Sequence, residues 1–249
     1  MKKIFIAITM VSVLFTSCKE NRGNKNTAEQ TSESSEKESK QTNEAICLLE
    51  KSSIRETPQA NGKWITSMSL GEKVMLTGEE TTDDASKKLY YKVKLIDGKE
   101  GWTRASFLGV NGEVGVLLED ANMYKRPDLL TKTDKKYSAM DIIAVLSTQG
   151  DWMEIKGKRG EGEYIEEGWI KTSNISNNEV DIATAKYAGL AEEKETMTER
   201  IKALQEIIEN PDLSSSAFIN VLKERVKDYE SKNRPIDVQD AKAEEESKK

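Results

Sequence analysis

The sequence predicts a mainly β protein with an α-helical C-terminus. Between residues 46 and 176, short runs of alternating apolar and polar residues are separated by glycine-containing turns. This pattern is typical of half-buried strands. After residue 176 the apolar residues recur every three or four positions, as they do in amphipathic helices. A polar stretch without aromatic residues precedes the strands, and a second polar stretch ends the chain.

Residues 1–17 have the composition of a secretory signal peptide. Lys2 and Lys3 give a basic start, and residues 4–16 form an apolar run of 13 residues. A transmembrane helix needs about 20 apolar residues, so this run is too short to span a bilayer. Residues 15–18, Phe-Thr-Ser-Cys, resemble the lipobox of bacterial lipoproteins. The resemblance implies cleavage before Cys18, a diacylglycerol thioether on its sulfur and an acyl chain such as palmitate on its amino group. The alternative is an ordinary secretory signal.

Two or three fatty chains on Cys18 would hold the protein on a membrane, whereas one chain binds reversibly. The resemblance therefore places the protein in the bacterial cell envelope, anchored to the membrane by lipid. Lys19 is not aspartate, which by resemblance to enterobacterial sorting allows transfer to an outer membrane where the organism has one. Residues 18–45 predict a disordered tether with a span of roughly 30 Å. Residues 233–249 predict a disordered tail.

Composition excludes several classes of protein. The chain has 38 basic and 44 acidic residues, and loss of residues 1–17 leaves 36 and 44. This acidic balance argues against a nucleic-acid partner. The absence of histidine excludes Ser-His and Cys-His nucleophile pairs and histidine metal sites. Cys47 lies in an apolar run and predicts a buried side chain, with a reactive thiol as the alternative. It has no disulfide partner if Cys18 carries lipid.

No group of residues predicts catalysis. The carboxylates lie in charge-mixed runs that are typical of solvated surfaces. The glycine-rich stretch 157–162 lacks the ending of a phosphate-binding loop and predicts a mobile hairpin loop. Calcium-loop and zinc spacings are missing from the sequence. We therefore expect no catalytic residue, no metal and no cofactor, with hydrolysis by carboxylates alone as the enzymatic alternative.

One unit of strands and turns occurs twice in the sequence. It resembles the bacterial SH3 domain, whose members often combine R-x-x-P, G-x-x-V, W-x-x-V and G-W-V motifs. The first copy matches at Arg55 and Pro58, Gly71 and Val74, Tyr90 and Val93, and Gly101-Trp102. The second copy matches at Trp152 and Ile155, and at Gly168-Trp169-Ile170. The resemblance implies two small SH3-like β-barrels, at residues 46–109 and 115–176.

Aromatic residues are the best candidates for ligand contact. Those on predicted strands, Trp102 and Trp169 among them, are expected chiefly to fill thin cores. The candidates in the loop-rich parts are Trp64, Tyr124, Tyr137 and Tyr164. Resemblance to SH3 domains implies shallow grooves that bind cell-wall peptides or segments of envelope proteins. It therefore implies a non-catalytic binding module.

The C-terminal pattern predicts a helical hairpin over residues 177–232. Residues 176–179 form a capping-box signature, and the apolar stripe then runs from Val180 to Ile208. Asn210 and Pro211 are expected to end this helix, and Ser214 to cap the second. The first helix is longer, so part of its stripe must cover an SH3-like unit, a second copy of the chain or another partner. A structural adaptor that assembles through these helices, as in a coiled coil, is therefore the alternative function.

Overall fold

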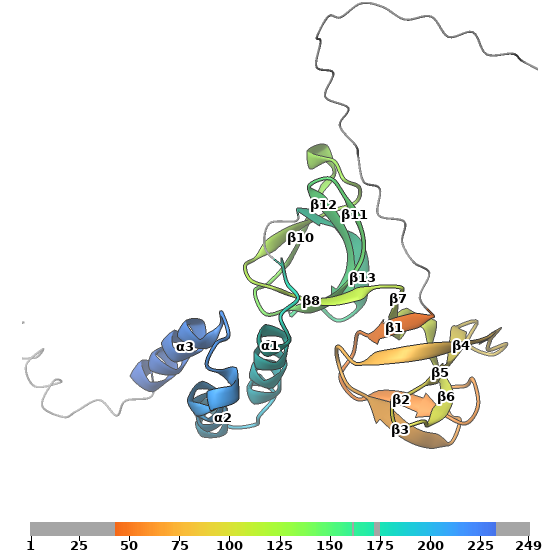
Figure 1. Cartoon of the computed structure of the whole chain (residues 1–249), viewed down its shortest axis with the longest axis horizontal. Coiled ribbons are helices and arrows are strands. Elements are labelled where there is room, and N and C mark those ends of the chain that lie inside the picture. Colours follow the sequence, from red (N-terminus) through yellow and green to blue (C-terminus); the bar gives the residue numbers. More distant parts are fainter. Residues whose placement is uncertain (1–42, 161, 172–174, 233–249) are drawn as a thin grey trace, which may run out of the picture. The chain divides into compact units, whose positions relative to one another are not determined.

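The computed structural model describes residues 43–160, 162–171 and 175–232 (Figure 1). The predicted signal peptide, Cys18, nearly all of the predicted tether and the predicted tail lie outside these residues. Within them, two β-sheets are followed by three α-helices. None of the described helices combines the length and apolar character that a membrane crossing requires. The predicted class, mainly β with a helical C-terminus, is confirmed.

The first sheet contains seven antiparallel strands in the order β3-β2-β6-β5-β4-β1-β7. The strands are β1 (Glu44–Cys47), β2 (Ser52–Arg55), β3 (Trp64–Met68), β4 (Lys73–Thr82), β5 (Leu89–Lys94), β6 (Glu100–Arg104) and β7 (Leu108–Val110). A 3-10 turn, η1 (Ala105–Phe107), joins β6 to β7. The core beneath the sheet is apolar and includes Ile54, Met68, Val93 and Leu108. Ile54, Met68 and Val93 each have more exposed neighbours along the chain, as strand alternation requires, whereas Leu108 is followed by buried Gly109.

The second sheet has seven strands in the order β10-β9-β13-β12-β11-β8-β14. They are β8 (Glu113–Leu117), β9 (Ala121–Tyr124), β10 (Lys132–Tyr137), β11 (Ile142–Gln149), β12 (Trp152–Lys158), β13 (Ile165–Lys171) and β14 (Ile175–Ser176). This order equals that of the first sheet when each strand number is raised by seven. The core includes Leu117, Tyr137, Ile143, Ile155 and Ile170.

The Gly-Trp motif occupies the same place in both sheets. In the first, Trp102 on β6 pairs with Arg55 on β2. In the second, Trp169 on β13 pairs with Tyr124 on β9. The neighbouring strand passes close to the preceding glycine in each sheet and leaves little room for a Cβ. A Cβ on Gly101 would lie 2.7 Å from the carbonyl oxygen of Arg55. A Cβ on Gly168 would lie 3.1 Å from that of Tyr124.

Three helices replace the predicted pair. They are α1 (Glu179–Glu192), α2 (Met197–Glu209) and α3 (Ile219–Lys232). The long helix expected up to Ile208 is interrupted because Thr196 begins a new helix. Its side chain accepts a hydrogen bond from the backbone N–H of Glu199, and the Glu199 carboxylate accepts one from the N–H of Thr196. This capping box satisfies two amide groups that a helix start otherwise leaves unpaired.

The predicted helix boundaries hold in part. α2 ends before Asn210 and Pro211, as expected. α1 is capped by Asn178, whose side chain accepts from the N–H of Val180, and not by the predicted box that begins at Ser176. Ser214 was expected to cap the last helix, but it lies at the end of the 3-10 turn η4 (Pro211–Leu213), and α3 begins only at Ile219.

The buried face of α1 is offset by one residue from the predicted stripe. The buried residues are Asp181, Thr184, Ala185, Ala188 and Ala191. Most of them are small, so α1 can lie close to its neighbours. The Asp181 carboxylate fixes this rotation, because it accepts from the hydroxyls of Ser176 and Ser216 at 2.6 and 2.9 Å. As a result Tyr187, which the prediction placed on the buried stripe, is 49% exposed.

Candidate ligand-binding site

A pocket of about 220 Å³ opens on the first sheet. Strands β2 and β6, the turn η1 and the loop between β1 and β2 form its walls. The lining residues are Leu49–Ser53, Arg55, Ala60, Tyr90, Trp102–Arg104 and Phe107. The pocket thus combines aromatic rings with basic side chains, a composition that suits a ligand with apolar and charged parts.

Strand register brings the principal side chains together. Tyr90 on β5 lies opposite Arg104 on β6, so both side chains stand on the same face. The Nε of Arg104 donates to the Tyr90 hydroxyl at 3.4 Å, and its guanidinium lies 5.6 Å from the ring centre of Phe107. Trp102, two residues before Arg104, is half-buried and shares this face. The arginine thus contacts the Tyr90 hydroxyl and the Phe107 ring.

The pocket is positively charged. It is lined by Lys51, Arg55 and Arg104, and none of these forms an ion pair within the described ranges. One Nη of Arg55 donates to the carbonyl oxygen of Gly62 at 2.6 Å, which fixes the side chain. The lone acidic lining residue, Glu50, accepts from the backbone N–H of Leu70 at 3.0 Å. Basic groups therefore dominate the pocket, although the whole chain is acidic.

Two buried hydroxyl groups belong to the same walls. Ser52 and Thr103 are 5% and 1% exposed, and neither hydroxyl has a hydrogen-bond partner among the described residues. A buried hydroxyl without a partner costs about 1–3 kcal/mol. The Ser52 hydroxyl lies near the thiol of Cys47, a weak acceptor, and burial raises the pKa of that thiol to about 11. Cys47 is thus buried, as predicted, and the raised pKa keeps its thiol protonated and unreactive near neutral pH.

The second sheet carries a related cluster at the equivalent register. Trp152 on β12 pairs with Lys171 on β13, where the first sheet has Tyr90 and Arg104. The Lys171 ammonium lies 5.2 Å from the Trp152 ring centre. Tyr124 packs edge-on against Trp152, with ring centres 4.9 Å apart. Both sheets therefore place an aromatic residue beside a cation at this register. They differ at the position in register with the tryptophan of the Gly-Trp pair, which is Arg55 in the first sheet and Tyr124 in the second.

The structure does not bring the four predicted contact residues together. Tyr124 belongs to the cluster on the second sheet. Trp64 is 59% exposed and pairs in register with Arg55, but it does not line the pocket. Its indole N–H donates to the Ser67 hydroxyl at 3.1 Å. Tyr164 is 73% exposed in the loop before β13.

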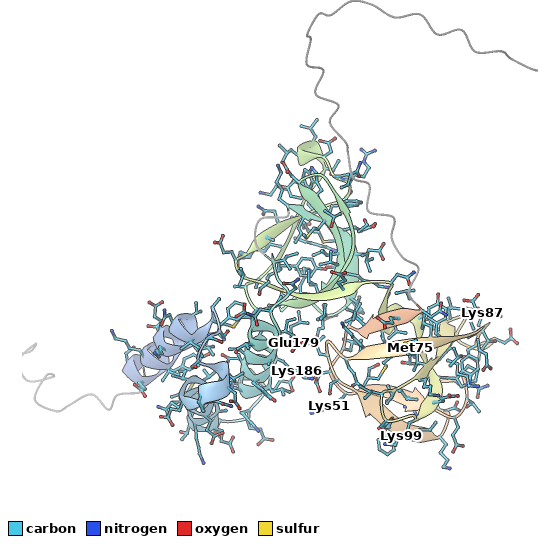
Figure 2. All side chains as sticks on the ribbon, viewed as in Figure 1. Lys51, Met75, Lys87, Lys99, Glu179 and Lys186 are labelled. Atoms are coloured by element: carbon cyan, nitrogen blue, oxygen red, sulfur yellow. The ribbon has the colours of Figure 1, made fainter. Side chains whose placement is uncertain are left out.

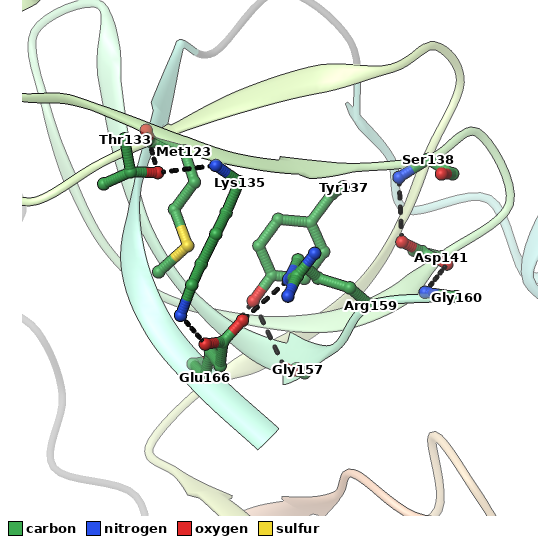
Figure 3. Close-up of polar contacts among 10 residues, drawn as sticks. All are labelled: Met123, Thr133, Lys135, Tyr137, Ser138, Asp141, Gly157, Arg159, Gly160 and Glu166. Atoms are coloured by element: carbon green, nitrogen blue, oxygen red, sulfur yellow. Dashed lines mark hydrogen bonds and ion pairs between the residues drawn. The ribbon is translucent and has the colours of Figure 1, made fainter. Parts of the chain in front are cut away.

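Tyr137, the fourth, is a wrong prediction, because it is fully buried. Its hydroxyl lies 3.2 and 3.1 Å from the carbonyl oxygens of Gly157 and Glu166, to which it donates (Figure 3). Burial raises the pKa of this hydroxyl. Exposed and buried positions alternate along β10, and this alternation turns Tyr137 inward. The residue therefore ties strands together and does not face a ligand.

Polar contacts beside Tyr137 hold the glycine-rich stretch that the sequence predicts to be a mobile loop (Figure 3). The Glu166 carboxylate accepts from Lys135 Nζ and, at 2.6 Å, from Arg159 Nε. Asp141 accepts from the N–H of Gly160 at 3.0 Å. Burial raises the pKa of Asp141. Burial also acts to raise the pKa of Glu166, but the hydrogen bonds from Lys135 and Arg159 outweigh it and lower that pKa. These contacts are structural, since they lie at the hairpin and not in the pocket.

Sequence reasoning missed Lys51 and Arg104. Charged residues of this kind are usually solvated, and nothing in their spacing distinguishes them from other surface cations. The alternation of Trp102 and Arg104 on one strand was the available signal. This alternation indicates a binding site only when the structure shows that Tyr90 of β5 and Phe107 of η1 lie beside Arg104.

Comparison with known proteins agrees with this description of the first sheet. Residues 52–109 match the family of the bacterial SH3 domain. The chain therefore contains a bacterial SH3-like domain, which spans β2 to β7 and holds most of the pocket. The match covers less than a quarter of the chain. No curated protein matches the chain.

Two solved structures are similar to the chain at a low level. They are NlpC2 and NlpC1 from Trichomonas vaginalis, with 16% and 13% sequence identity. Each comparison covers 61% of this chain and has a TM-score of 0.23. The matched part spans 56% and 53% of those two proteins, about half of their length. A likeness at this level supports no argument about activity.

Proposed function

We propose that this chain is a non-catalytic binding module whose bacterial SH3-like domain captures cell-wall peptide in the pocket between β2, β6 and η1. The observation that carries the proposal is the pocket itself. Most of it lies on residues that match the SH3 family, it joins aromatic to basic side chains, and its cations are not engaged by acidic groups of the described chain. Peptides suit such a groove because they combine apolar, polar and charged groups within a short length.

We further propose that residues 115–176 form a second SH3-like barrel. The support is topological. Both sheets have the same strand order. In each, the tryptophan of the Gly-Trp pair lies in register with a residue on the second strand of the unit, Arg55 on β2 or Tyr124 on β9. Two unrelated folds would not be expected to pair Trp102 and Trp169 with equivalent strands in the same register. The proposal of tandem domains therefore rests on more than the short sequence motifs.

The envelope location is also part of the proposal. Its support is the lipobox-like sequence that ends at Cys18, which lies outside the described residues. A lipid anchor would hold the pocket near the wall, and residues 18–45 would give it room to reach a ligand. Labelling with radioactive palmitate tests this part. Incorporation that the Cys18→Ser variant abolishes would support the anchor, and equal labelling of both proteins would contradict it.

Co-sedimentation with purified peptidoglycan tests the binding function. The informative variant is Lys51→Glu, and Lys87→Glu is its control (both residues are labelled in Figure 2). The two lysines are matched, since both lie in loops of the first sheet with left-handed backbone, φ 56° and 55°. We expect the wild type and Lys87→Glu to sediment with the wall, and Lys51→Glu to remain in solution. Equal sedimentation of all three proteins would contradict a role for the pocket. If none of the three proteins sediments, the proposed capture of cell-wall peptide is contradicted.

An adaptor that assembles through its helices is the second candidate. A groove of about 270 Å³ lies on the helices and is lined by Tyr187, Leu190, Ala191, Lys194, Ala203, Glu206, Ile207, Asn210 and Leu213. Tyr187 is half-exposed there. Light scattering at micromolar concentration would detect a dimer that the Tyr187→Glu variant disrupts. A monomeric wild type would exclude self-association as the function.

A further inference from the structure

We infer that the pocket of the SH3-like domain selects its ligand through a carboxylate group, and that the related cluster on the second sheet does not. The inference deepens the proposed function and rests on it. It names the group that is recognised, the side chains that recognise it and the domain in which recognition takes place.

The first argument is local charge. Three cations and one carboxylate line the pocket, whereas the chain as a whole has a net charge of −6. Five lysines elsewhere on this sheet and its loops pair with carboxylates at 2.6 to 3.7 Å, namely Lys63, Lys87, Lys92, Lys94 and Lys99. The three pocket cations have no such pair in the described chain. Three unneutralised cations that line one pocket of an acidic protein form a local attraction for anions.

The second argument is the geometry of the donors. Arg104 uses its Nε toward Tyr90, and its guanidinium lies near the Phe107 ring. Its two Nη groups make no hydrogen bond within the described residues. Arg55 is likewise held by one bond to Gly62 and keeps further N–H groups. A planar guanidinium with free Nη groups matches the two oxygens of a carboxylate. Both arginines are fixed before the ligand arrives, so less conformational freedom is lost on binding.

The third argument is the divergence of the second sheet. Tyr124 takes the register position of Arg55, and Lys171 takes that of Arg104. The cluster therefore has one ammonium group, positioned over the Trp152 ring, and no guanidinium. The Tyr124 ring packs against Trp152. At the same position the first sheet has the side chain of Arg55. Among Tyr124, Trp152 and Lys171, a carboxylate would find one ammonium group and no planar pair of donors.

Titration calorimetry on the chain from residue 18, with Cys18→Ser to keep it free of lipid, tests the inference. The first ligand is a soluble pentapeptide with the composition of a cell-wall stem peptide, with free carboxylates. The second is the same peptide with every carboxylate converted to a primary amide. A hydrogen bond to a charged group contributes about 1.5–3 kcal/mol, so we expect the amide to bind about tenfold to a hundredfold more weakly. Binding of the acid form should also weaken as salt is added.

Variants locate the effect. Arg104→Gln should reduce affinity for the acid form by a similar factor and make the two peptides nearly equal. Lys171→Gln, the matched change on the second sheet, should leave both affinities unchanged. Circular dichroism checks that Arg104→Gln is folded. Lys51→Gln, in a loop, supplies a second variant that does not alter a strand, and it should reduce the preference for the acid form at least threefold.

The outcomes separate the two levels of the proposal. Equal affinity of the acid and amide peptides would overturn carboxylate recognition and leave the binding function intact. A loss in Lys171→Gln as large as that in Arg104→Gln would overturn the assignment to the first sheet. If neither peptide binds while the chain sediments with whole peptidoglycan, the carboxylate of a stem peptide is not the recognised group. If the chain does not sediment either, the proposed function fails together with the inference.

Discussion

Replacement of Glu166 by glutamine should destabilise the second sheet without altering its shape. The carboxylate accepts from Lys135 Nζ and Arg159 Nε, and the three side chains are 20%, 43% and 17% exposed. Glutamine has the same size but no charge, and its amide nitrogen cannot accept a hydrogen bond. One of the two donors would therefore lose its partner, and both cations would lose their counter-charge.

The degree of burial sets the size of the effect. Breaking a fully buried ion pair costs about 3–5 kcal/mol, whereas a solvent-exposed pair contributes about 0–1 kcal/mol. Glu166 and Arg159 lie between these limits but nearer to the buried one, and Lys135 is the most exposed of the three. We therefore expect Glu166→Gln to lower the free energy of unfolding by about 2 kcal/mol near pH 7.

The pH dependence follows from the lowered pKa of Glu166. A carboxyl group whose pKa is lower in the folded than in the unfolded state stabilises the fold above the unfolded pKa. That contribution is lost as the pH falls through the folded pKa. The stability difference between the wild type and Glu166→Gln should thus be complete at neutral pH. It should shrink as the pH falls below the ordinary value of 4.5.

Urea denaturation followed by tryptophan fluorescence at neutral and acidic pH measures both effects. Glu167→Gln is the control, because Glu167 is the next residue on β13 and is exposed. We expect it to lie within about 0.5 kcal/mol of the wild type. A neutral-pH stability of Glu166→Gln equal to that of Glu167→Gln would refute the view that this carboxylate fixes the hairpin.

Three further predictions concern other parts of the fold. Gly101→Ala should lower stability by about 1–3 kcal/mol in urea denaturation, because its Cβ would meet Arg55 O at 2.7 Å; an unchanged midpoint would contradict the close crossing of β2 and β6. Burial raises the pKa of the Cys47 thiol to about 11, so iodoacetamide near pH 8 should modify it slowly in the native protein and rapidly in urea. Rapid modification of the native protein would show that the core opens there. Asp181→Asn should weaken the contacts to Ser216 Oγ and to the N–H of Ala217, at 2.9 and 2.8 Å, and lower the helical melting temperature. A melting curve identical to that of the wild type would contradict this role.

Much of the fold could be predicted because the strands obey simple alternation. The Gly-Trp motif was also informative, since the neighbouring strand leaves little room for a Cβ at the glycine. The break between α1 and α2 was missed although its signal is local. Thr196 and Glu199 have the spacing of a capping box, but the apolar stripe continued through them and suggested one long helix.

The candidate site was harder to predict than the fold. Aromatic residues in loops pointed to Trp64 and Tyr164, which are exposed but lie outside the pocket. Tyr137 was misplaced because its burial depends on which face of β10 meets the core. Arg104 becomes a candidate only once strand pairing sets it beside Tyr90 and η1 sets it beside Phe107. Spacing along one chain cannot supply these contacts, since they join residues of different elements.

Chemical-shift mapping tests the central claim that a ligand binds in the pocket of the first sheet. An isotope-labelled chain would be titrated with a soluble cell-wall fragment. The account predicts that the largest amide shifts occur at pocket residues such as Ser53, Thr103 and Phe107. Shifts centred instead on Trp152 and Lys171, or on the helices, would contradict it.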